Sequence, residues 1–270
     1  MPELPEVETT RRGITPLVLG RQLTGVTVRE ARLRWPVPDQ LGKILGGQRL
    51  GSVGRRGKYL LLAFDHGTLI VHLGMSGSLR VLHAHIEPVK HDHLDLVFGE
   101  HCLRYHDPRR FGAVLWTNAD PAQHQLLRHL GPEPLGPDFD GECLHQAASG
   151  RRVAVKNLIM DGRVVVGVGN IYANESLFMA GIRPDRACNR ISRARYHRLA
   201  ECIRQVLRAA IAQGGTTLQD FQQADGKPGY FAQELQVYGR SGEACVICDQ
   251  GIREKTIGQR ASYYCAHCQR

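Results

Sequence analysis

Residues 50–82 read LGSVGRRGKYLLLAFDHGTLIVHLGMSGSLRVL, a stretch that is apolar or alternating except at His66-Gly67, Gly74 and Gly77. Short apolar runs separated by turn residues are typical of antiparallel strands. Comparable runs flank this stretch at 23–29, 94–98 and 103–116. The sequence therefore predicts an antiparallel β-sandwich or barrel over about residues 22–117.

Helical patterns lie on both sides of this β region. Residues 5–19 carry Val7 and Ile14 at helical spacing, and Pro16 is expected to end or kink that helix. Further helices are predicted over 139–148, 152–160, 170–180 and 192–212. We expect an α+β protein in which 1–130 form an N-terminal helix plus antiparallel β-sandwich domain, 131–137 a Gly- and Pro-rich linker, 138–233 a helical domain, and 234–270 a cysteine module.

The charge of the chain indicates a polyanion as partner. The 270 residues carry 35 Lys and Arg against 26 Asp and Glu, and arginines cluster, as at Arg109-Arg110 and Arg151-Arg152. The planar fork of arginine suits phosphate oxygens, although a solvated basic face on a protein with another task is the alternative. No run approaches the roughly 20 apolar residues of a membrane helix. The first residues have no signal core, so we expect a cytoplasmic protein without membrane contact.

Four of the eight cysteines form two CxxC pairs, Cys245/Cys248 and Cys265/Cys268, with 16 residues between the pairs. Four thiolates at such a spacing are typical of a zinc ribbon, where they complete a closed tetrahedral site. Because that site has no open position, we expect one structural Zn²⁺ and not a catalytic one. Disulfides are the weaker alternative in a chain that lacks secretion signals.

The segment between the two cysteine pairs carries Lys255 and Arg260. We expect both at the tip of a metal-stapled hairpin, from which two cations can enter a narrow anionic space. Two ordinary solvated charges are the alternative for these residues.

The amino terminus carries a group that can act as a nucleophile. Removal of Met1 before the small residue Pro2 exposes a secondary amine, and α-amino groups ionise near pH 7.7–8.0, so a neutral fraction is available. Attack of this amine on a sugar C1′ gives an iminium that acidifies the C2′ proton and prepares β-elimination. Glu3 and Glu6 are placed to move protons. Ordinary helix capping is the alternative for the two acids.

Seven motifs occur in one order along the chain: PELPEVE (2–8), GKYL (57–60), HLGMSG (72–77), HDH (91–93), DPRRFG (107–112), GVGNIY (167–172) and the cysteine module. In this combination they resemble the bacterial formamidopyrimidine-DNA glycosylases, which repair 8-oxoguanine. The resemblance runs through the whole chain. It implies a bifunctional glycosylase and abasic-site lyase, with a helix–two-turn–helix element in the helical domain and a β-hairpin zinc finger at the end.

The resemblance also implies roles for single residues. Pro2 corresponds to the nucleophile and Glu3 to the general acid at the sugar. Lys58 matches a lysine of phosphate contact and β-elimination, and Arg260 matches the zinc-finger arginine that holds phosphate and assists δ-elimination. The DNA-contact positions of the family fall on His91, Arg109, Arg151 and Asn170. Residues 216–231 match the loop that closes over the extruded lesion.

A base inside a duplex hides its C1′, so the damaged nucleotide must be flipped out, at a cost of a few kcal/mol. By the resemblance, Met75, Arg109 and Phe111 fill the vacancy, with Arg109 pairing the orphaned cytosine. Apolar wedges of this kind unstack and kink DNA. Core packing is the alternative for Met75 and Phe111 taken singly.

The implied substrate is double-stranded DNA with 8-oxoguanine opposite cytosine, formamidopyrimidines or abasic sites, handled by a monomer at the bacterial nucleoid and cut by β,δ-elimination. The endonuclease-VIII-like relatives prefer oxidised pyrimidines, and Leu4, Met75 and Arg109-Arg110-Phe111 separate this chain from them. Two other hypotheses remain: a non-catalytic zinc-ribbon protein that binds DNA or RNA, and a lyase without glycosylase activity.

Overall fold

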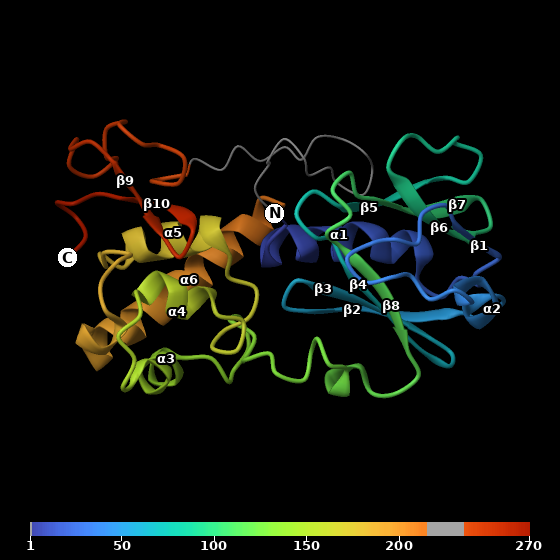
Figure 1. The fold of residues 1–270 in the computed structure, drawn as a ribbon, viewed down its shortest axis with the longest axis horizontal. Helices are drawn as coiled ribbons and strands as arrows, with labels where there is room; N and C mark the ends of the chain where they lie inside the picture. Colours follow the sequence, from blue (N-terminus) through green and yellow to red (C-terminus); the bar gives the residue numbers. More distant parts are fainter. Residues whose placement is uncertain (1, 215–234) are drawn as a thin grey trace. The chain divides into compact units, whose positions relative to one another are not determined.

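The computed structural model describes residues 2–214 and 235–270, which fall into two compact units (Figure 1). Unit 1 contains residues 2–128 with 213–214, and unit 2 contains residues 129–212 with 235–270. The domain boundaries at 130, 137 and 233 stay predictions. The loop predicted at 216–231 lies outside the described residues.

Unit 1 is built on two four-stranded antiparallel sheets, with strand orders β2-β3-β4-β8 and β1-β6-β7-β5. The strands are β1 (Gly25–Val28), β2 (Leu50–Arg56), β3 (Tyr59–Phe64), β4 (Gly67–His72), β5 (Ser78–His83), β6 (Asp92–Phe98), β7 (His101–His106) and β8 (Ala113–Thr117). The predicted antiparallel β-sandwich is confirmed.

One hydrophobic core joins the two sheets. Along β3 the side chains alternate, and Leu60, Leu62 and Phe64 point into this core. Phe98 of β6 meets Phe64 across the sandwich, with ring centroids 6.5 Å apart and nearly parallel planes. Fully burying an aliphatic or aromatic side chain contributes roughly 1.5–3 kcal/mol, so this alternation fixes which face of each strand turns inward.

The first helix, α1 (Leu4–Val18), packs its Val7 and Ile14 face against the same core. Of the two effects expected of Pro16, an end or a kink, the helix does not end there, because α1 continues two residues further to Val18. Pro16 lies in the last turn, and the Leu19 N–H still closes that turn by donating to the Thr15 carbonyl at 3.0 Å. Two short elements, α2 (Leu41–Leu45) and the 3-10 turn η1 (Pro121–Gln123), were not predicted.

Two of the predicted runs are each a pair of strands. Residues 50–64 form the β2–β3 hairpin, because Gly57 adopts φ +55° and reverses the chain at Gly57-Lys58. Residues 103–116 are split into β7 and β8 by the loop 107–112. Both turns carry residues that the sequence assigned to the site.

Unit 2 contains the predicted helices and the cysteine hairpin: α3 (Gly141–Ala148), α4 (Val155–Met160), α5 (Asn170–Met179), the 3-10 turn η2 (Cys188–Arg190), α6 (Arg193–Ala212), β9 (Arg253–Ile257) and β10 (Arg260–Tyr264). The Asp140 side chain caps α3 by accepting from the Cys143 N–H at 2.8 Å. Helix α6 packs against α3 and α5, and α5 packs against β10. Within residues 2–214 and 235–270, no helix is long and apolar enough to cross a membrane.

Candidate active site and metal centre

The start of α1 holds Pro2 and Glu3 in buried positions. Glu3 is the N-cap residue, and its N–H donates to Glu6 Oε2 at 2.8 Å as part of a Glu3–Glu6 capping box. A capping box satisfies amides that a helix start leaves without partners. Pro2 is buried, and Glu3 and Glu6 are each 2% exposed. The predicted nucleophile and acid therefore lie side by side at a rigid helix terminus.

Lys58 lies in the tight turn between β2 and β3, where Gly57 supplies the positive φ. The Glu8 carboxylate of α1 accepts from Arg11 at 2.8 Å and from Arg55 of β2 at 3.3 Å. Burial acts to raise the pKa of Glu8, but hydrogen bonds from Arg11 and a second arginine of α1 hold it at about 2. Glu8 thus ties the helix that carries Pro2 to the hairpin that carries Lys58.

His72 ends β4 opposite Tyr59, with ring centroids 4.8 Å apart. Its Nδ1 accepts from the Gly74 N–H at 3.1 Å, which requires a ring without a proton on that nitrogen. Burial, followed by the positive charges of Lys58 and Arg34, lowers the pKa of His72 to about 4. A pocket of about 130 Å³ adjoins it, lined by Arg34, Trp35, Tyr59, His72, Phe111, Ala113 and Leu126. His72 opens the motif HLGMSG, but the sequence alone predicts no role for it.

The loops that carry Met75 and Phe111 are in direct contact. Gly74 has φ +65°, and a Cβ there would lie 2.5 Å from the Gly112 nitrogen and 2.6 Å from the Phe111 carbonyl carbon. Only glycine permits this approach. Met75 is half-buried, whereas Phe111 leaves 43% of its surface exposed. The Arg109 guanidinium carbon lies 4.7 Å from the centroid of the Phe111 ring.

Asp107, with 0% exposure, organises these loops. Its carboxylate accepts from the Gly112 N–H at 2.9 Å, from the Arg109 N–H at 3.3 Å and from the Ser76 hydroxyl at 3.3 Å. Its own N–H donates to the His91 carbonyl at 3.1 Å. Asp107 therefore connects three segments of unit 1 that were predicted to contact the duplex: its own loop 107–112 and the Met75 loop through the carboxylate, and His91 through the backbone N–H. This role was not predicted from the sequence, where the available signal is an acid at the turn between two apolar runs.

In unit 2 the four predicted cysteines form one cluster. The Sγ atoms of Cys245, Cys248, Cys265 and Cys268 all lie within 4.8 Å of one another, and two of the residues are buried. A group of four thiols this close together can hold a metal ion. Glu175 of α5 anchors the chain leading into the cluster, because its carboxylate accepts from three consecutive N–H groups, those of Gln236, Val237 and Tyr238, at 2.8–3.0 Å.

The sequence counts Lys156 among the basic residues that cluster with Arg151 and Arg152, but the structure buries it, and it holds the hairpin against the helices. Lys156 of α4 is 0% exposed, and its Nζ donates to the Ala261 carbonyl at 2.9 Å and to the Ser262 hydroxyl at 2.5 Å. Asn170 Nδ2 donates to the same Ala261 carbonyl at 3.1 Å. Arg260 directly precedes these residues at the start of β10. The structure therefore brings Asn170 and the Arg260 segment together.

Two other predicted residues of unit 2 lie apart from this contact. Arg151 is exposed before α4. Lys255 was expected at the hairpin tip, and that prediction is wrong: the turn is Gly258-Gln259, Lys255 pairs with Ser262 in mid-strand, and its Nζ donates to Asp185 at 3.0 Å. Of Lys255 and Arg260, only Arg260 lies beside the tip of the hairpin.

The comparisons with known proteins agree with this geometry. Residues 1–114 match the formamidopyrimidine-DNA glycosylase N-terminal domain, and residues 130–222 match the formamidopyrimidine-DNA glycosylase H2TH domain. The formamidopyrimidine-DNA glycosylases of Methylococcus capsulatus and Teredinibacter turnerae are 63% and 60% identical to the chain, each over the full length of both proteins.

Solved structures show the same fold. The MutM (Fpg) protein of Thermus thermophilus superposes with a TM-score of 0.89 at 38% identity, covering 99% of this chain and 98% of that one. The Lactococcus lactis Fpg in complex with abasic-site DNA has a TM-score of 0.92 at 33% identity, covering 99% of each chain.

A proline-headed helix on a β-sandwich, followed by helices and a four-cysteine hairpin, defines the class of DNA glycosylases that carry an H2TH domain. Within that class, the chain belongs to the formamidopyrimidine-DNA glycosylase family. It is an enzyme of DNA repair, and abasic-site lyase activity is typical of its family.

Proposed function

We propose that the protein excises 8-oxoguanine opposite cytosine, and ring-opened formamidopyrimidines, from double-stranded DNA through a Schiff base at Pro2. It then cuts the strand by β,δ-elimination. The observation that carries this proposal is the buried Pro2-Glu3 pair at the capped start of α1. Two neighbouring groups, a nucleophile and a proton source, are what covalent amine catalysis at a sugar requires.

Removal of Met1 leaves Pro2 with a secondary amine. Its nitrogen attacks C1′, the C1′–N bond to the base breaks, and the departing base takes up a proton with Glu3 as the general acid. The nitrogen loses its proton, and its lone pair then displaces O4′ from C1′, so that the sugar ring opens, O4′ takes up a proton and the iminium with C1′ forms. Loss of the C2′ proton expels the 3′ phosphate, and a second elimination expels the 5′ phosphate. Lys58 assists the first elimination and Arg260 the second.

The geometry of unit 1 supports a role of Met75, Arg109 and Phe111 in filling the space of the extruded nucleotide. The Gly74 contact and the Asp107 carboxylate fix the two loops together, and Phe111 presents an apolar ring that is partly exposed. A partly exposed aromatic ring under a guanidinium is suited to stacking in a gap between bases.

The proposed contacts with the DNA backbone come from His91 of unit 1 and from residues of unit 2. Asn170 begins α5, where the helix dipole favours a phosphate, and Arg151 and Arg260 add charge. The four cysteines would hold one Zn²⁺, and the donor set fits because four thiolates complete a tetrahedral site with no open position. The ion supplies a structural cross-link that holds the Arg260 hairpin.

The same proposal includes the cellular setting. The relatives named above come from bacteria, and the proposed substrate is chromosomal DNA, so the protein would act in the cytoplasm at the nucleoid. We propose that it does so as a monomer.

The test is borohydride trapping on an abasic duplex. We expect a covalent complex whose cross-link maps to Pro2 by mass spectrometry. Glu3→Gln should keep this trapping but lose excision of 8-oxoguanine, because the acid is needed for the base to leave and not for the lyase step. A sample that retains Met1, with the amine of Pro2 blocked, should do neither.

Trapping on a lysine in place of Pro2 would overturn the mechanism. Binding without any nicking would favour the non-catalytic zinc-ribbon hypothesis. Nicking of abasic DNA with the oxidised base left intact in the wild type would favour a lyase alone.

A further inference from the structure

An arginine-lined concavity lies on unit 2, outside the residues assigned to catalysis. It has a volume of about 310 Å³ and is lined by Arg183, Asp185, Arg186, Ala187 and Arg190. Residues 181–198 contain six arginines and one acid. This is a dense cluster of positive charge, and three of its arginines line the hollow.

The acid that lines the hollow is already paired twice. Asp185 accepts from Arg183 through both oxygens at 3.1 Å, and from Lys255 at 3.0 Å. Burial acts to raise the pKa of Asp185, but the hydrogen bonds from Lys255 and Arg183 lower it. One carboxylate thus faces two cations, and the local charge stays positive.

The remaining two arginines have no carboxylate partner within residues 2–214 and 235–270. Arg186 Nε makes a long contact of 3.4 Å with the Arg190 carbonyl oxygen. The charge of Arg186 also affects Arg195, whose pKa is lowered by burial and then by the coulombic effect of Arg186. The hollow therefore has an uncompensated positive field, and two guanidinium groups remain available to a ligand.

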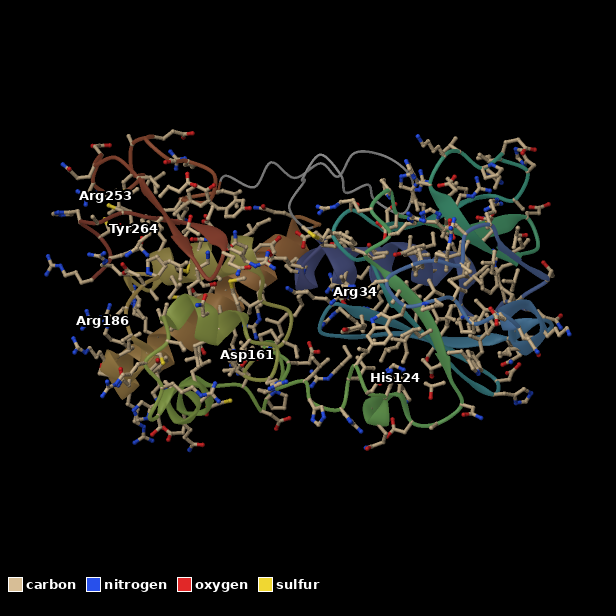
Figure 2. All side chains as sticks on the ribbon, in the orientation of Figure 1. Arg34, His124, Asp161, Arg186, Arg253 and Tyr264 are labelled. Atoms are coloured by element: carbon tan, nitrogen blue, oxygen red, sulfur yellow. The ribbon has the colours of Figure 1, made fainter. Side chains whose placement is uncertain are left out.

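The hollow is held in shape by backbone hydrogen bonds. The loop 183–190 runs beside residues 151–156, with Val155 N–H donating to the Arg186 carbonyl at 2.8 Å and Cys188 N–H to the Val153 carbonyl at 2.9 Å. The Arg183 guanidinium stacks over Tyr264 of β10 at 5.3 Å. Figure 2 shows the labelled Arg186 and Tyr264 on the same side of unit 2. A ligand would meet a site that needs little reorganisation.

From these contacts we propose that the concavity formed by Arg183, Arg186 and Arg190 binds a backbone phosphate of duplex DNA, as a contact separate from those of Asn170 and Arg260. The guanidinium group of arginine can donate two parallel hydrogen bonds to the oxygens of a phosphodiester. A phosphate contact carries no sequence information, so it would hold undamaged DNA as well as damaged DNA. The proposal depends on DNA being the substrate, as proposed above.

The test compares two double variants that each remove two positive charges. Arg186→Gln with Arg190→Gln empties the concavity, and Arg198→Gln with Arg208→Gln removes two exposed arginines of α6 that do not line it. Affinity for an undamaged duplex is measured by fluorescence anisotropy over a series of KCl concentrations. Each lost phosphate contact lowers the slope of log K against log salt by about 0.9.

We expect the concavity variant to lose about 1 to 2 from this slope, and roughly 5- to 20-fold in affinity at low salt, while the α6 variant keeps the wild-type slope. Single-turnover nicking of an abasic duplex at saturating enzyme should be unchanged in both. Because nicking reports Pro2 chemistry, a failure of the proposed function and a failure of this contact give different results.

Equal slopes in all three proteins, or equal losses in both variants, would overturn the proposal. A third measurement distinguishes binding of a free phosphate ion from binding of DNA. If sodium phosphate raises the melting temperature of the wild type and not of the concavity variant, while the DNA slopes agree, the hollow binds small phosphate ions and the assignment to DNA is wrong.

Discussion

At the scale of single residues, the site of unit 1 depends on groups whose protonation is set by burial. His72 is neutral because the Gly74 N–H needs its Nδ1 as acceptor and because Lys58 and Arg34 disfavour a further positive charge. The ring therefore holds the loop before Met75 without adding charge. A proton on Nδ1 would break that hydrogen bond.

We expect His72→Asn to remove part of the acid sensitivity of the protein. The pKa of His72 is about 4 in the folded protein and about 6.5 in an unfolded chain. Between pH 6.5 and 4, His72 is therefore protonated in the unfolded chain and neutral in the folded protein. The wild type thus loses stability across that window, by at most about 3 kcal/mol. Asparagine keeps an acceptor and does not titrate.

Urea unfolding at several pH values between 4 and 7.5 checks this prediction. The other histidines contribute equally to both proteins, so the difference in unfolding free energy isolates His72. Parallel curves for wild type and variant over the whole range would contradict the assignment of a half-buried, neutral ring.

Asp107→Asn should loosen the predicted duplex-contacting loops. An amide accepts through one oxygen only, so donors among Gly112 N–H, Arg109 N–H and the Ser76 hydroxyl lose their partner. We expect a cost of about 1–3 kcal/mol in unfolding free energy. The ratio of 8-oxoguanine excision opposite cytosine to excision opposite adenine should fall, because Arg109 is no longer oriented. Gel assays on the two duplexes measure this ratio.

Ser76→Ala is the matched control for that variant, since it removes one donor to Asp107 and leaves the two backbone donors in place. It should keep most of the opposite-base preference. An unchanged ratio in Asp107→Asn itself would show that the carboxylate does not position Arg109.

At the scale of elements, the hairpin β9–β10 is held by side chains of the helices beneath it. Lys156 and Asn170 share the Ala261 carbonyl, and Asn174 Oδ1 accepts from the Tyr263 N–H at 2.8 Å. The position of Arg260 is therefore determined by α4 and α5 as well as by the cysteine cluster.

Lys156→Met should displace Arg260 without releasing the proposed Zn²⁺. Methionine has a similar length but no donor, so the Ala261 carbonyl and the Ser262 hydroxyl lose the buried ammonium. With Arg260 misplaced, we expect the second elimination to slow about 10-fold, so that β-elimination product accumulates on an abasic duplex. Lys43→Met removes an exposed lysine of α2 and should nick like the wild type.

Metal content by mass spectrometry and the two products on a sequencing gel provide the readout. Retained zinc with an unchanged ratio of the two products would show that Lys156 does not position the hairpin. Loss of zinc together with loss of binding would mean that the lysine stabilises the whole module.

At the scale of the whole molecule, the sequence predicted the elements better than the turns between them. Apolar alternation revealed the sandwich, and CxxC spacing revealed the thiol cluster, because both are local patterns. The hairpin at Gly57 and the loop at 107 were merged into longer runs, since a positive φ or a buried acid leaves no periodic signal. Lys255 was misplaced because its partner Asp185 is 70 residues away along the chain.

In the candidate site, too, local sequence patterns were predictive and tertiary contacts were not. Motif resemblance supplied Pro2, Lys58 and Arg260, whereas the residues that position them had to come from tertiary contacts. Asp107 and Lys156 act through hydrogen bonds to other segments, and no property of the neighbouring sequence reports a distant carbonyl or hydroxyl.

Two units with separate cores predict that loss of the proposed Zn²⁺ unfolds only part of the chain. The core of the cysteine module is small, with Val237 and Ile252 packed around Cys245, Cys265 and Phe178. Without an ion the four thiols no longer cross-link it, whereas the sandwich keeps a large core of its own.

Treatment of the intact protein with a zinc chelator should therefore expose amides in residues 235–270 to hydrogen exchange, while β3, β4 and β7 stay protected. Duplex binding should be lost with the exposure of the hairpin, because Arg260 is no longer held. Added Zn²⁺ should restore both binding and protection. Exchange that rises in the sandwich strands at the same rate as in residues 235–270 would show instead that the two units unfold as one.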